Sequence, residues 1–312
     1  MPEVRGRIAV VGGANVDIGG FPTATLIAGD SNPGRVRIST GGVGRNIAEN
    51  AARMGLEVSL ITALGDDANG RMLLEDCRAK GIRTEDCVID GAGRTSVYLF
   101  IDDARGDMYC AVNDMEIQSR LTPERISPAL DRLNALDAMV IDANLPEETI
   151  RFLAQELRVP LFADAVSVAK AGKLRCALEK IYCLKPNRIE AELLTGVQIR
   201  DVVDAAEAAK RLNDAGVRRV YLSMGLQGAL CAEDGRCTFL PCRARGVVNA
   251  TGAGDAFSAA LVWAYCEGMD LRQSGIAGMA AAAIAAGAME TVSPEMSRAR
   301  LIRGMAELSA EL

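Results

Sequence analysis

Short runs of apolar residues alternate with longer amphipathic segments along most of the chain. The apolar runs predict buried strands, and the amphipathic segments predict helices. Expected strands are residues 8–11, 57–63, 138–141, 161–163, 181–184 and 219–223; expected helices are 47–54, 69–80, 146–156 and 202–215. Strands that alternate with helices are typical of a mostly parallel sheet with helices on both faces. Near the C-terminus, residues 256–266 and 274–287 are so apolar that they predict buried helices.

Two stretches interrupt this alternation. Residues 16–40 place Gly, Pro, Asp and Ser between short alternating pieces, and residues 95–112 alternate like two strands joined by a turn. We expect them to pair as a small β-sheet that acts as a lid over the strand ends, where such folds bind ligands. The chain, residues 1–312, is thus interpreted as one domain with a lid. Edges of the lid sheet could also pair with a second copy, so a homodimer is a further expectation.

Composition narrows the chemistry and the partners. The 312 residues include no histidine, which excludes His-based triads, bases and metal ligands. A net charge of −6 gives no overall field that attracts nucleic acid or anionic lipid. No apolar run is long enough to span a bilayer, no signal peptide is apparent, and the nine cysteines form no Cys-x-x-Cys pair. We therefore expect a cytoplasmic protein with small-molecule partners and no nucleic-acid or membrane partner.

The motif with the most specific chemistry is Thr-Gly-Ala-Gly-Asp at residues 251–255, between a strand-like piece at 248–250 and a buried helix. Its glycines let the backbone approach a ligand closely, and the helix N-terminus offers N–H groups to a phosphate. Asp255, in the first helical turn, can accept the proton of a hydroxyl that attacks this phosphate. The alternative is that Asp255 only caps the helix.

Two further motifs are suited to a sugar. Asn15 and Asp17 follow the first expected strand, where a carboxylate can accept two hydroxyls of a diol. Glycines at 41, 42 and 44 open the helix that contains Asn46, whose amide can bind sugar hydroxyls. Ordinary turn and capping roles are the alternatives at these positions. Neither stretch matches the dinucleotide-binding fingerprint, and a Walker A loop is absent.

Two motifs are suited to a nucleotide and its metal. Asn187 and Glu190 follow the expected strand 181–184 and share one face of a helical turn. Their oxygens suit Mg²⁺, often through water, although a simple capping pair is the alternative. Residues 222–228 end a strand in a glycine turn, which suits nucleotide contacts.

Together these motifs resemble the PfkB carbohydrate kinase family, with Gly41-Gly42 through Asn46 and Thr251 through Asp255 in the family's order and spacing. The resemblance covers essentially the whole chain and implies a ribokinase-like three-layer α/β/α core, a mostly parallel sheet and a small β-sheet lid. It implies transfer of the ATP γ-phosphate to an alcohol group. A narrower likeness to the pseudouridine kinases, at residues 30–34, 42–48, 95–98, 113–115 and 184–188, implies the 5′-hydroxyl of pseudouridine as the acceptor. A kinase of another nucleoside or free sugar (ribose, fructose, inosine) and a non-catalytic nucleoside-binding sensor are the alternatives.

The resemblance also implies roles for individual residues. Asp255 matches the family's catalytic base, and Gly252, Ala253 and Gly254 match the family's anion hole. Contacts to ATP are implied for Asn187, Ser223, Gly225, Gly228 and Thr251, with Glu190 at Mg²⁺. Substrate contacts are implied for Asn15, Asp17, Gly42, Arg45, Asn46, Thr95, Ser96, Tyr98 and Asn113, the last four as candidates for the uracil edge. Asn249 stands where many members carry an Asp that helps to hold a monovalent cation, which puts K⁺ activation in doubt.

Overall fold

Among the residues that the structure describes, the main sheet has eight strands in the order β14-β13-β12-β11-β10-β9-β1-β4. All pairs from β12 to β4 are parallel, and β13 and β14 add an antiparallel hairpin at one edge. The computed structural model describes residues 6–242 and 248–311. The strands of this sheet are β1 (Arg7–Val11), β4 (Glu57–Ile61), β9 (Ala138–Asp142), β10 (Leu161–Asp164), β11 (Ile181–Lys185), β12 (Arg219–Ser223), β13 (Gly228–Glu233) and β14 (Arg236–Pro241).

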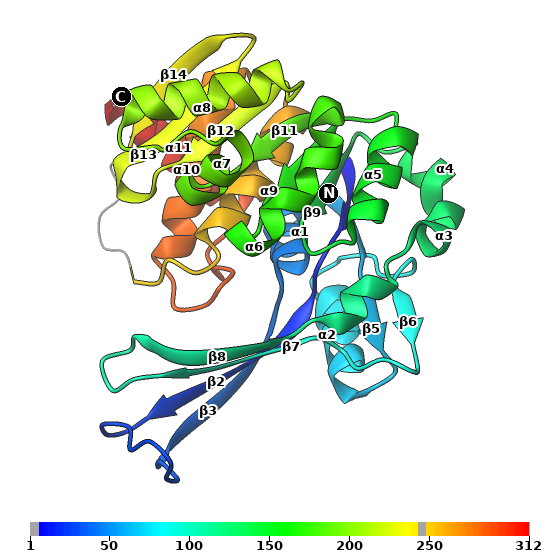
Figure 1. Ribbon diagram of the computed structural model, residues 1–312, viewed down its shortest axis with the longest axis vertical. Coiled ribbons are helices and arrows are strands. Elements are labelled where there is room, and N and C mark those ends of the chain that lie inside the picture. Colours follow the sequence, from blue (N-terminus) through cyan, green and yellow to red (C-terminus); the bar gives the residue numbers. More distant parts are fainter. Residues whose placement is uncertain (1–5, 243–247, 312) are drawn as a thin grey trace.

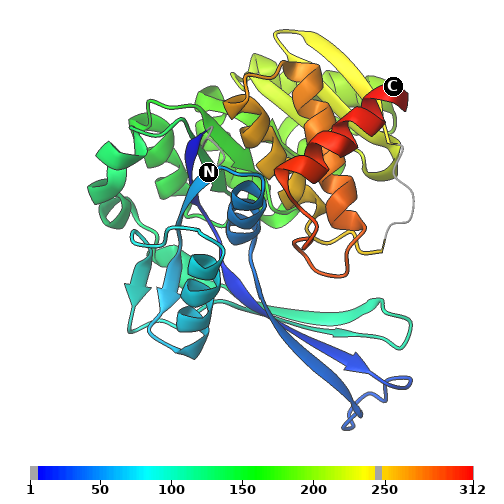
Figure 2. The same cartoon turned by 180° about the vertical axis from the view of Figure 1, so that it is seen from behind.

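Helices cover both faces of this sheet (Figures 1 and 2). One face carries α1 (Val43–Arg53), α9 (Ala253–Cys266), α10 (Leu271–Ala286) and α11 (Arg298–Glu311). The other carries α3 (Pro123–Ile126), α4 (Leu130–Leu133), α5 (Glu147–Glu156), α6 (Val168–Ala171), α7 (Arg188–Thr195) and α8 (Val202–Asp214). Short 3₁₀ segments are η1 (Glu116–Arg120), η2 (Ser127–Ala129), η3 (Gly172–Lys180) and η4 (Gly225–Gln227).

Alternation along β1 explains how two cores form. Ile8 and Val10 point into the core shared with α1, α9 and α10, whereas Ala9 and Val11 point into the core on the opposite face. Because successive side chains of a strand face opposite sides, an all-apolar strand has both faces covered. The expected three-layer α/β/α fold is confirmed.

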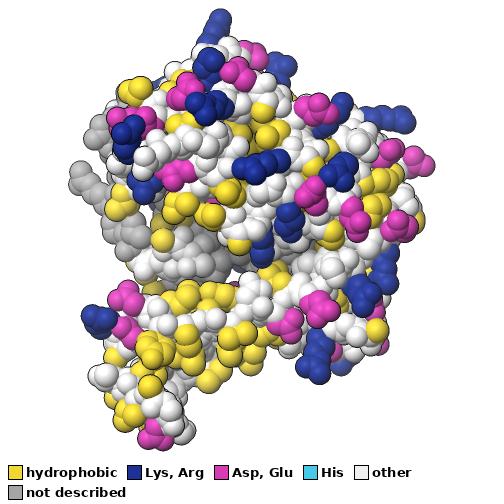
Figure 3. Space-filling view, in the orientation of Figure 1, with side chains coloured by type: hydrophobic (Ala, Val, Ile, Leu, Met, Phe, Trp, Pro, Cys, Tyr) yellow, Lys and Arg dark blue, Asp and Glu magenta, His cyan; other side chains and the backbone are white. Residues whose placement is uncertain are grey.

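The two interrupting stretches pair, as expected, into a separate four-stranded sheet in the order β3-β2-β7-β8, here called the outer sheet. Its strands are β2 (Asn15–Pro22), β3 (Gly34–Gly41), β7 (Val97–Asp102) and β8 (Met108–Asp114). It extends away from the main body (Figures 1 and 2), and hydrophobic side chains gather along it (Figure 3). Between these strands along the chain lie α2 (Ala68–Ala79) and a two-stranded sheet of β5 (Ala63–Gly65) and β6 (Val88–Asp90).

The predicted strand-like entry at residues 248–250 is wrong. Val248 and Asn249 donate their backbone N–H groups to Ala286 O at 2.8 and 3.1 Å, at the end of α10, so these groups are not available to a strand partner. None of the helices in residues 6–242 and 248–311 combines the length and apolarity needed to cross a membrane.

Candidate active site

Polar side chains converge where four parallel strands end. Asp142 closes β9, Asp164 closes β10, Lys185 closes β11, and Gly12 follows β1 in the neighbouring position of the sheet. Because carboxyl ends of parallel strands meet at one edge, these residues lie together. A Cβ on Gly12 would collide with the Asp142 carboxylate, so the absence of a side chain there lets the strand ends approach.

The N-terminus of α9 faces this edge without a side-chain cap. Gly252 occupies the N-cap position with φ 82°, and a Cβ there would collide with Thr291 O. Only glycine accommodates both constraints easily. Since no side chain caps α9, the amide groups of its first turn can bind an anion, and the helix dipole favours one.

Asp255 lies in the first turn of α9 and not at its cap. Its Oδ2 accepts a hydrogen bond from Asn46 Nδ2 at 2.9 Å, across 209 positions of sequence. Burial, reinforced by the nearby Asp164 carboxylate, raises the pKa of Asp255 to about 7, while Asn46 and Lys185 act in the opposite direction. A carboxylate whose pKa lies near neutral pH is suited to accept a proton from a substrate hydroxyl.

Lys185 is a site residue to which the sequence motifs assigned no role. Its ammonium pairs with Asp164 Oδ2 at 3.0 Å, and a Cβ on Gly254 would lie 2.9 Å from Lys185 Nζ. Burial alone would lower the pKa of Lys185, but Asp164 and Glu190 outweigh it and the pKa is raised. A permanent positive charge therefore adjoins the uncapped start of α9. A lysine that closes a buried strand, as in Leu184-Lys185-Pro186, is the sequence signal for such a residue.

Asn187 and Glu190 form a reciprocal capping box at the start of α7. Asn187 Oδ1 accepts the Glu190 N–H at 2.9 Å, and Glu190 Oε2 accepts the Asn187 N–H at 2.8 Å. Glu190 is only 3% exposed, and burial raises the pKa of its carboxyl. The capping alternative thus describes these contacts, but the cap uses one carboxylate oxygen of Glu190. Among the described residues, no three acidic or Cys side chains form a ready metal site.

The residues predicted for the sugar lie where the outer sheet joins the main body. Asn15 donates to Asp17 Oδ1 at 2.6 Å, and a Cβ on Gly41 would collide with the Asp17 carboxylate. Gly42, with φ 99°, turns the chain from β3 into α1 and thereby places Asn46 opposite Asp255. Burial raises the pKa of Asp17, and Asn15 and Arg45 counteract it. Asp17, Asn46 and Asp255 therefore come from three separate elements.

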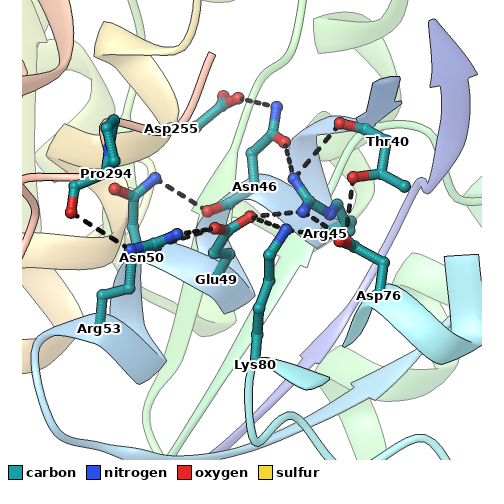
Figure 4. A network of polar contacts seen from close by, with 10 residues as sticks. All are labelled: Thr40, Arg45, Asn46, Glu49, Asn50, Arg53, Asp76, Lys80, Asp255 and Pro294. Atoms are coloured by element: carbon teal, nitrogen blue, oxygen red, sulfur yellow. Dashed lines mark hydrogen bonds and ion pairs between the residues drawn. The ribbon is translucent and has the colours of Figure 1, made fainter. Parts of the chain in front are cut away.

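Arg45 lies beneath this site in a buried polar network (Figure 4). It is 2% exposed and pairs with Glu49, one helical turn away, and with Asp76 Oδ2 at 2.7 Å on α2. It also donates to Asn46 Oδ1 at 3.1 Å. Its contacts thus link α1 to α2 and also reach the Asn46 amide.

The four residues predicted for the base edge separate into two pairs. Thr95 and Ser96 are buried, and their hydroxyls already bond to Asp67 and Gln118, respectively. Tyr98 is half-buried and Asn113 is exposed. Both lie in register with Asp17 across the outer sheet, so the three side chains leave the same face.

The residues predicted for the nucleotide lie on the C-terminal side of the sheet. Ser223 ends β12 and donates its N–H to Pro186 O at 2.9 Å, which places it beside Asn187. Gly225 and Gly228 bracket η4 with φ 57° and 131°. Thr251 is exposed, and its N–H donates to Asn249 Oδ1 at 2.9 Å.

A second lysine near the strand ends was not predicted. Lys170 on α6 donates to Asn144 Oδ1 at 2.5 Å and lies 3.6 Å from Met115 Sδ. Burial lowers its pKa, and Asp142 counteracts that effect. Val166, between β10 and α6, has φ 65°, which is strained for a β-branched residue. Sequence offered no signal for this geometry, because it depends on contacts between segments far apart along the chain.

Comparison with known proteins identifies relatives over nearly the full length. The model of the pfkB family of carbohydrate kinases matches residues 5–298. Pseudouridine kinase of Escherichia coli is 34% identical over 297 residues, covering 95% of each chain. Guanosine-inosine kinase of Exiguobacterium acetylicum is 28% identical, covering 82% of this chain and 86% of that protein. The structure of Arabidopsis thaliana ribokinase complexed with ribose and ATP superposes with a TM-score of 0.87 at 21% identity, covering 96% of this chain and 98% of that one.

Proposed function

Because the chain belongs to the pfkB family of carbohydrate kinases, we propose that it phosphorylates the 5′-hydroxyl of pseudouridine with ATP, with Asp255 as the general base. Members of this family are phosphotransferases that act on hydroxyl groups and use ATP. The choice of pseudouridine is supported by the 34% identity to the Escherichia coli enzyme of that name.

One observation carries the catalytic assignment. A carboxylate with a pKa near 7 stands in the same helical turn as an uncapped, glycine-rich anion site. A sensor that only binds a nucleoside would gain nothing from this combination, because an unfavourably buried acid beside an empty anion site weakens the fold. A kinase needs both groups within one turn, since the attacking hydroxyl and the transferred phosphoryl group must be adjacent.

The proposal gives each residue a part in the reaction. Asp17 and Asn46 hold the ribose hydroxyls, and Asn46 also favours the ionised form of Asp255 through its 2.9 Å hydrogen bond. Asp255 accepts the proton of the 5′-hydroxyl. The N–H groups of Gly252, Ala253 and Gly254, aided by the Lys185 ammonium, stabilise the negative charge on the phosphoryl oxygens.

The residues present also fit a nucleotide and its metal. Gly254, where a Cβ would lie 2.9 Å from Lys185 Nζ, leaves room beside the Lys185 ammonium, and this cation suits phosphate oxygens. Bound Mg²⁺ would neutralise phosphate charge, and it commonly uses one or two carboxylates plus phosphate and water. Glu190 has one oxygen outside its cap for this purpose. Ser223, Gly225 and Gly228 are assigned to the nucleotide, with Asn187 and Thr251 beside its phosphates.

The outer sheet is assigned as a lid over the nucleoside. Asp17, Tyr98 and Asn113 share its site-facing side, so Tyr98 and Asn113 are the candidates that read the uracil edge. Thr95 and Ser96 support that face from within, through Asp67 and Gln118. Closure over the acceptor would exclude water, which otherwise competes for the phosphoryl group.

An acceptor panel tests the proposal. ADP formation is measured with pseudouridine, uridine, inosine, ribose and fructose, and kcat/KM is expected to be highest for pseudouridine. A preference for inosine or a free sugar would reject pseudouridine but keep the kinase assignment. Ligand binding without ADP formation from any acceptor would instead favour the sensor.

A further inference from the structure

Arg45 contacts both the framework and the active-site amide (Figure 4). Its guanidinium pairs with Glu49 and Asp76, lies 3.4 Å from Thr40 O, and donates to Asn46 Oδ1 at 3.1 Å. The same Asn46 amide donates through Nδ2 to Asp255 Oδ2 at 2.9 Å. A continuous chain of hydrogen bonds therefore runs from Asp76 on α2 to Asp255 on α9.

The chemistry of Arg45 determines which way the Asn46 amide points. A guanidinium has only donors, so the atom of Asn46 that faces it must be the carbonyl oxygen. The NH₂ group must then face Asp255, where the ionised carboxylate requires a donor. The flipped amide would oppose two donors on one side and two acceptors on the other.

Stability alone is a poor explanation for this arrangement. Arg45 and Glu49 are each 2% exposed, and no group in the described part of the chain accepts a hydrogen bond from the Arg45 Nε–H. Replacing a buried ion pair by apolar residues is often neutral or stabilising, so such pairs are weak evidence for a stabilising role. Lys80 and Arg53 also pair with Glu49, so the network would keep cations without Arg45. What neither of them contacts is Asn46.

We propose that Arg45 is a positioning residue, which orients the Asn46 amide so that its NH₂ group favours the ionised form of Asp255 and aims the carboxylate at the acceptor hydroxyl. The inference rests on the proposed role of Asp255 as the base. Around Asp255, Asp164 on β10 and Asp142 on β9 oppose ionisation, whereas Lys185 on β11 and Asn46 on α1 support it. Of the two supporting groups, Asn46 is the one whose effect depends on which way its amide points, and Arg45 sets that orientation.

The first experiment compares pH profiles of kcat/KM for Arg45→Met and Lys80→Met, using whichever acceptor the wild type phosphorylates. Losing one hydrogen bond to a charged group is expected to move the acid limb of Arg45→Met upward by about one pH unit, which is a loss of about fivefold at pH 7 that grows toward tenfold at lower pH and recovers at high pH. Lys80→Met removes a cation from the same two carboxylates without touching Asn46. Its acid limb is expected to stay in place, and equal shifts in both variants would overturn the proposal.

A double-mutant cycle tests the route of action. In an Asn46→Ala background, Arg45→Met is expected to cause no further shift, because the amide it orients is gone. A full additional shift would show that Arg45 acts by another path. Should Arg45→Met fail to fold, Arg45→Lys retains the buried cation but lacks the fork that reaches both Asp76 and Asn46. It is expected to show the same shift, and an unmoved limb would overturn the proposal.

A readout without turnover separates this inference from the proposed function. The carboxyl of Asp255 is followed by ¹³C NMR in the ligand-free protein and assigned by its loss in Asp255→Asn. Its titration midpoint is expected near 7 in the wild type and about one unit higher in Arg45→Met. A moved midpoint in a protein that phosphorylates no acceptor would sink the function but keep the positioning role. An active kinase with an unmoved midpoint would sink only the positioning role.

Discussion

Asp255 is an acid whose surroundings oppose its ionised form. The pKa of Asp255 in the folded chain is about 7, above the ordinary value of 3.8. The folded chain therefore binds this proton more tightly than the unfolded chain does. This group therefore destabilises the fold as pH rises from about 4, and the penalty is complete above about 7. Such a cost is expected at a catalytic residue, where activity requires a group that stability does not favour.

Asp255→Asn should accordingly lower activity and raise stability together. Removing the base is expected to reduce kcat by about 10²–10⁴-fold with little change in acceptor binding. The melting temperature should exceed that of the wild type at pH 8.5, and the difference should shrink at pH 5.5. Activity assays and calorimetry at both pH values measure this, with exposed Asp66→Asn as the control. Near-normal kcat would reject Asp255 as the base.

At the scale of single residues, the sequence predicted motifs whose residues are adjacent along the chain, but not the contacts between residues that are far apart along it. Asp255 and its glycines lie within five consecutive positions, so their motif can be recognised in the sequence. The partners of that motif, Asn46, Lys185 and Asp164, come from other elements and meet it only through the fold. Thr95 shows the converse case, because a polar residue suited to a ligand is used by Asp67 instead.

Elements were predictable where an apolar pattern had one explanation. The expected helix 47–54 is observed as Val43–Arg53, because Gly42 at φ 99° lets α1 begin immediately after the β3 strand. The β13–β14 hairpin was not predicted. Its two-residue turn is Asp234-Gly235, with φ 50° and 76°, so the sequence does contain the local Asp-Gly signal of a tight hairpin.

The capping box of α7 permits a test that separates structure from catalysis. Glu190→Gln removes the charge but keeps an amide oxygen that can accept the Asn187 N–H. The chain already uses such a box at α10, where Gln273 Oε1 accepts the Asp270 N–H at 3.1 Å. We expect a melting temperature within about 2 °C of the wild type, but an increase of about tenfold in the Mg²⁺ concentration for half-maximal rate. An unchanged dependence of the rate on Mg²⁺ would show that Glu190 caps α7 and does not bind the metal.

At the scale of the whole molecule, the outer sheet has two unlike faces. The site-facing side carries Asp17, Tyr98 and Asn113. The opposite side carries a row in register across all four strands: Ile38, Ile18, Leu99 and Val112. Near the main body this side is buried, because Val16 packs in one apolar cluster with Leu73 of α2. Farther out Val36, Ile38 and Val112 are 72%, 60% and 64% exposed.

We propose that a second copy of the chain covers this apolar side in a symmetric dimer. An exposed apolar face that spans a whole sheet and continues a buried core is typical of an interface. A twofold axis would let the face pair with itself while the site-facing side of each lid stays open to substrate.

Light scattering should give twice the 33.0 kDa chain mass. Val112→Glu should shift the protein toward monomer, whereas Ala111→Glu, the adjacent residue on the opposite face, should not. A wild-type protein of single-chain mass would reject the dimer, and equal effects of the two substitutions would reject this face as its interface.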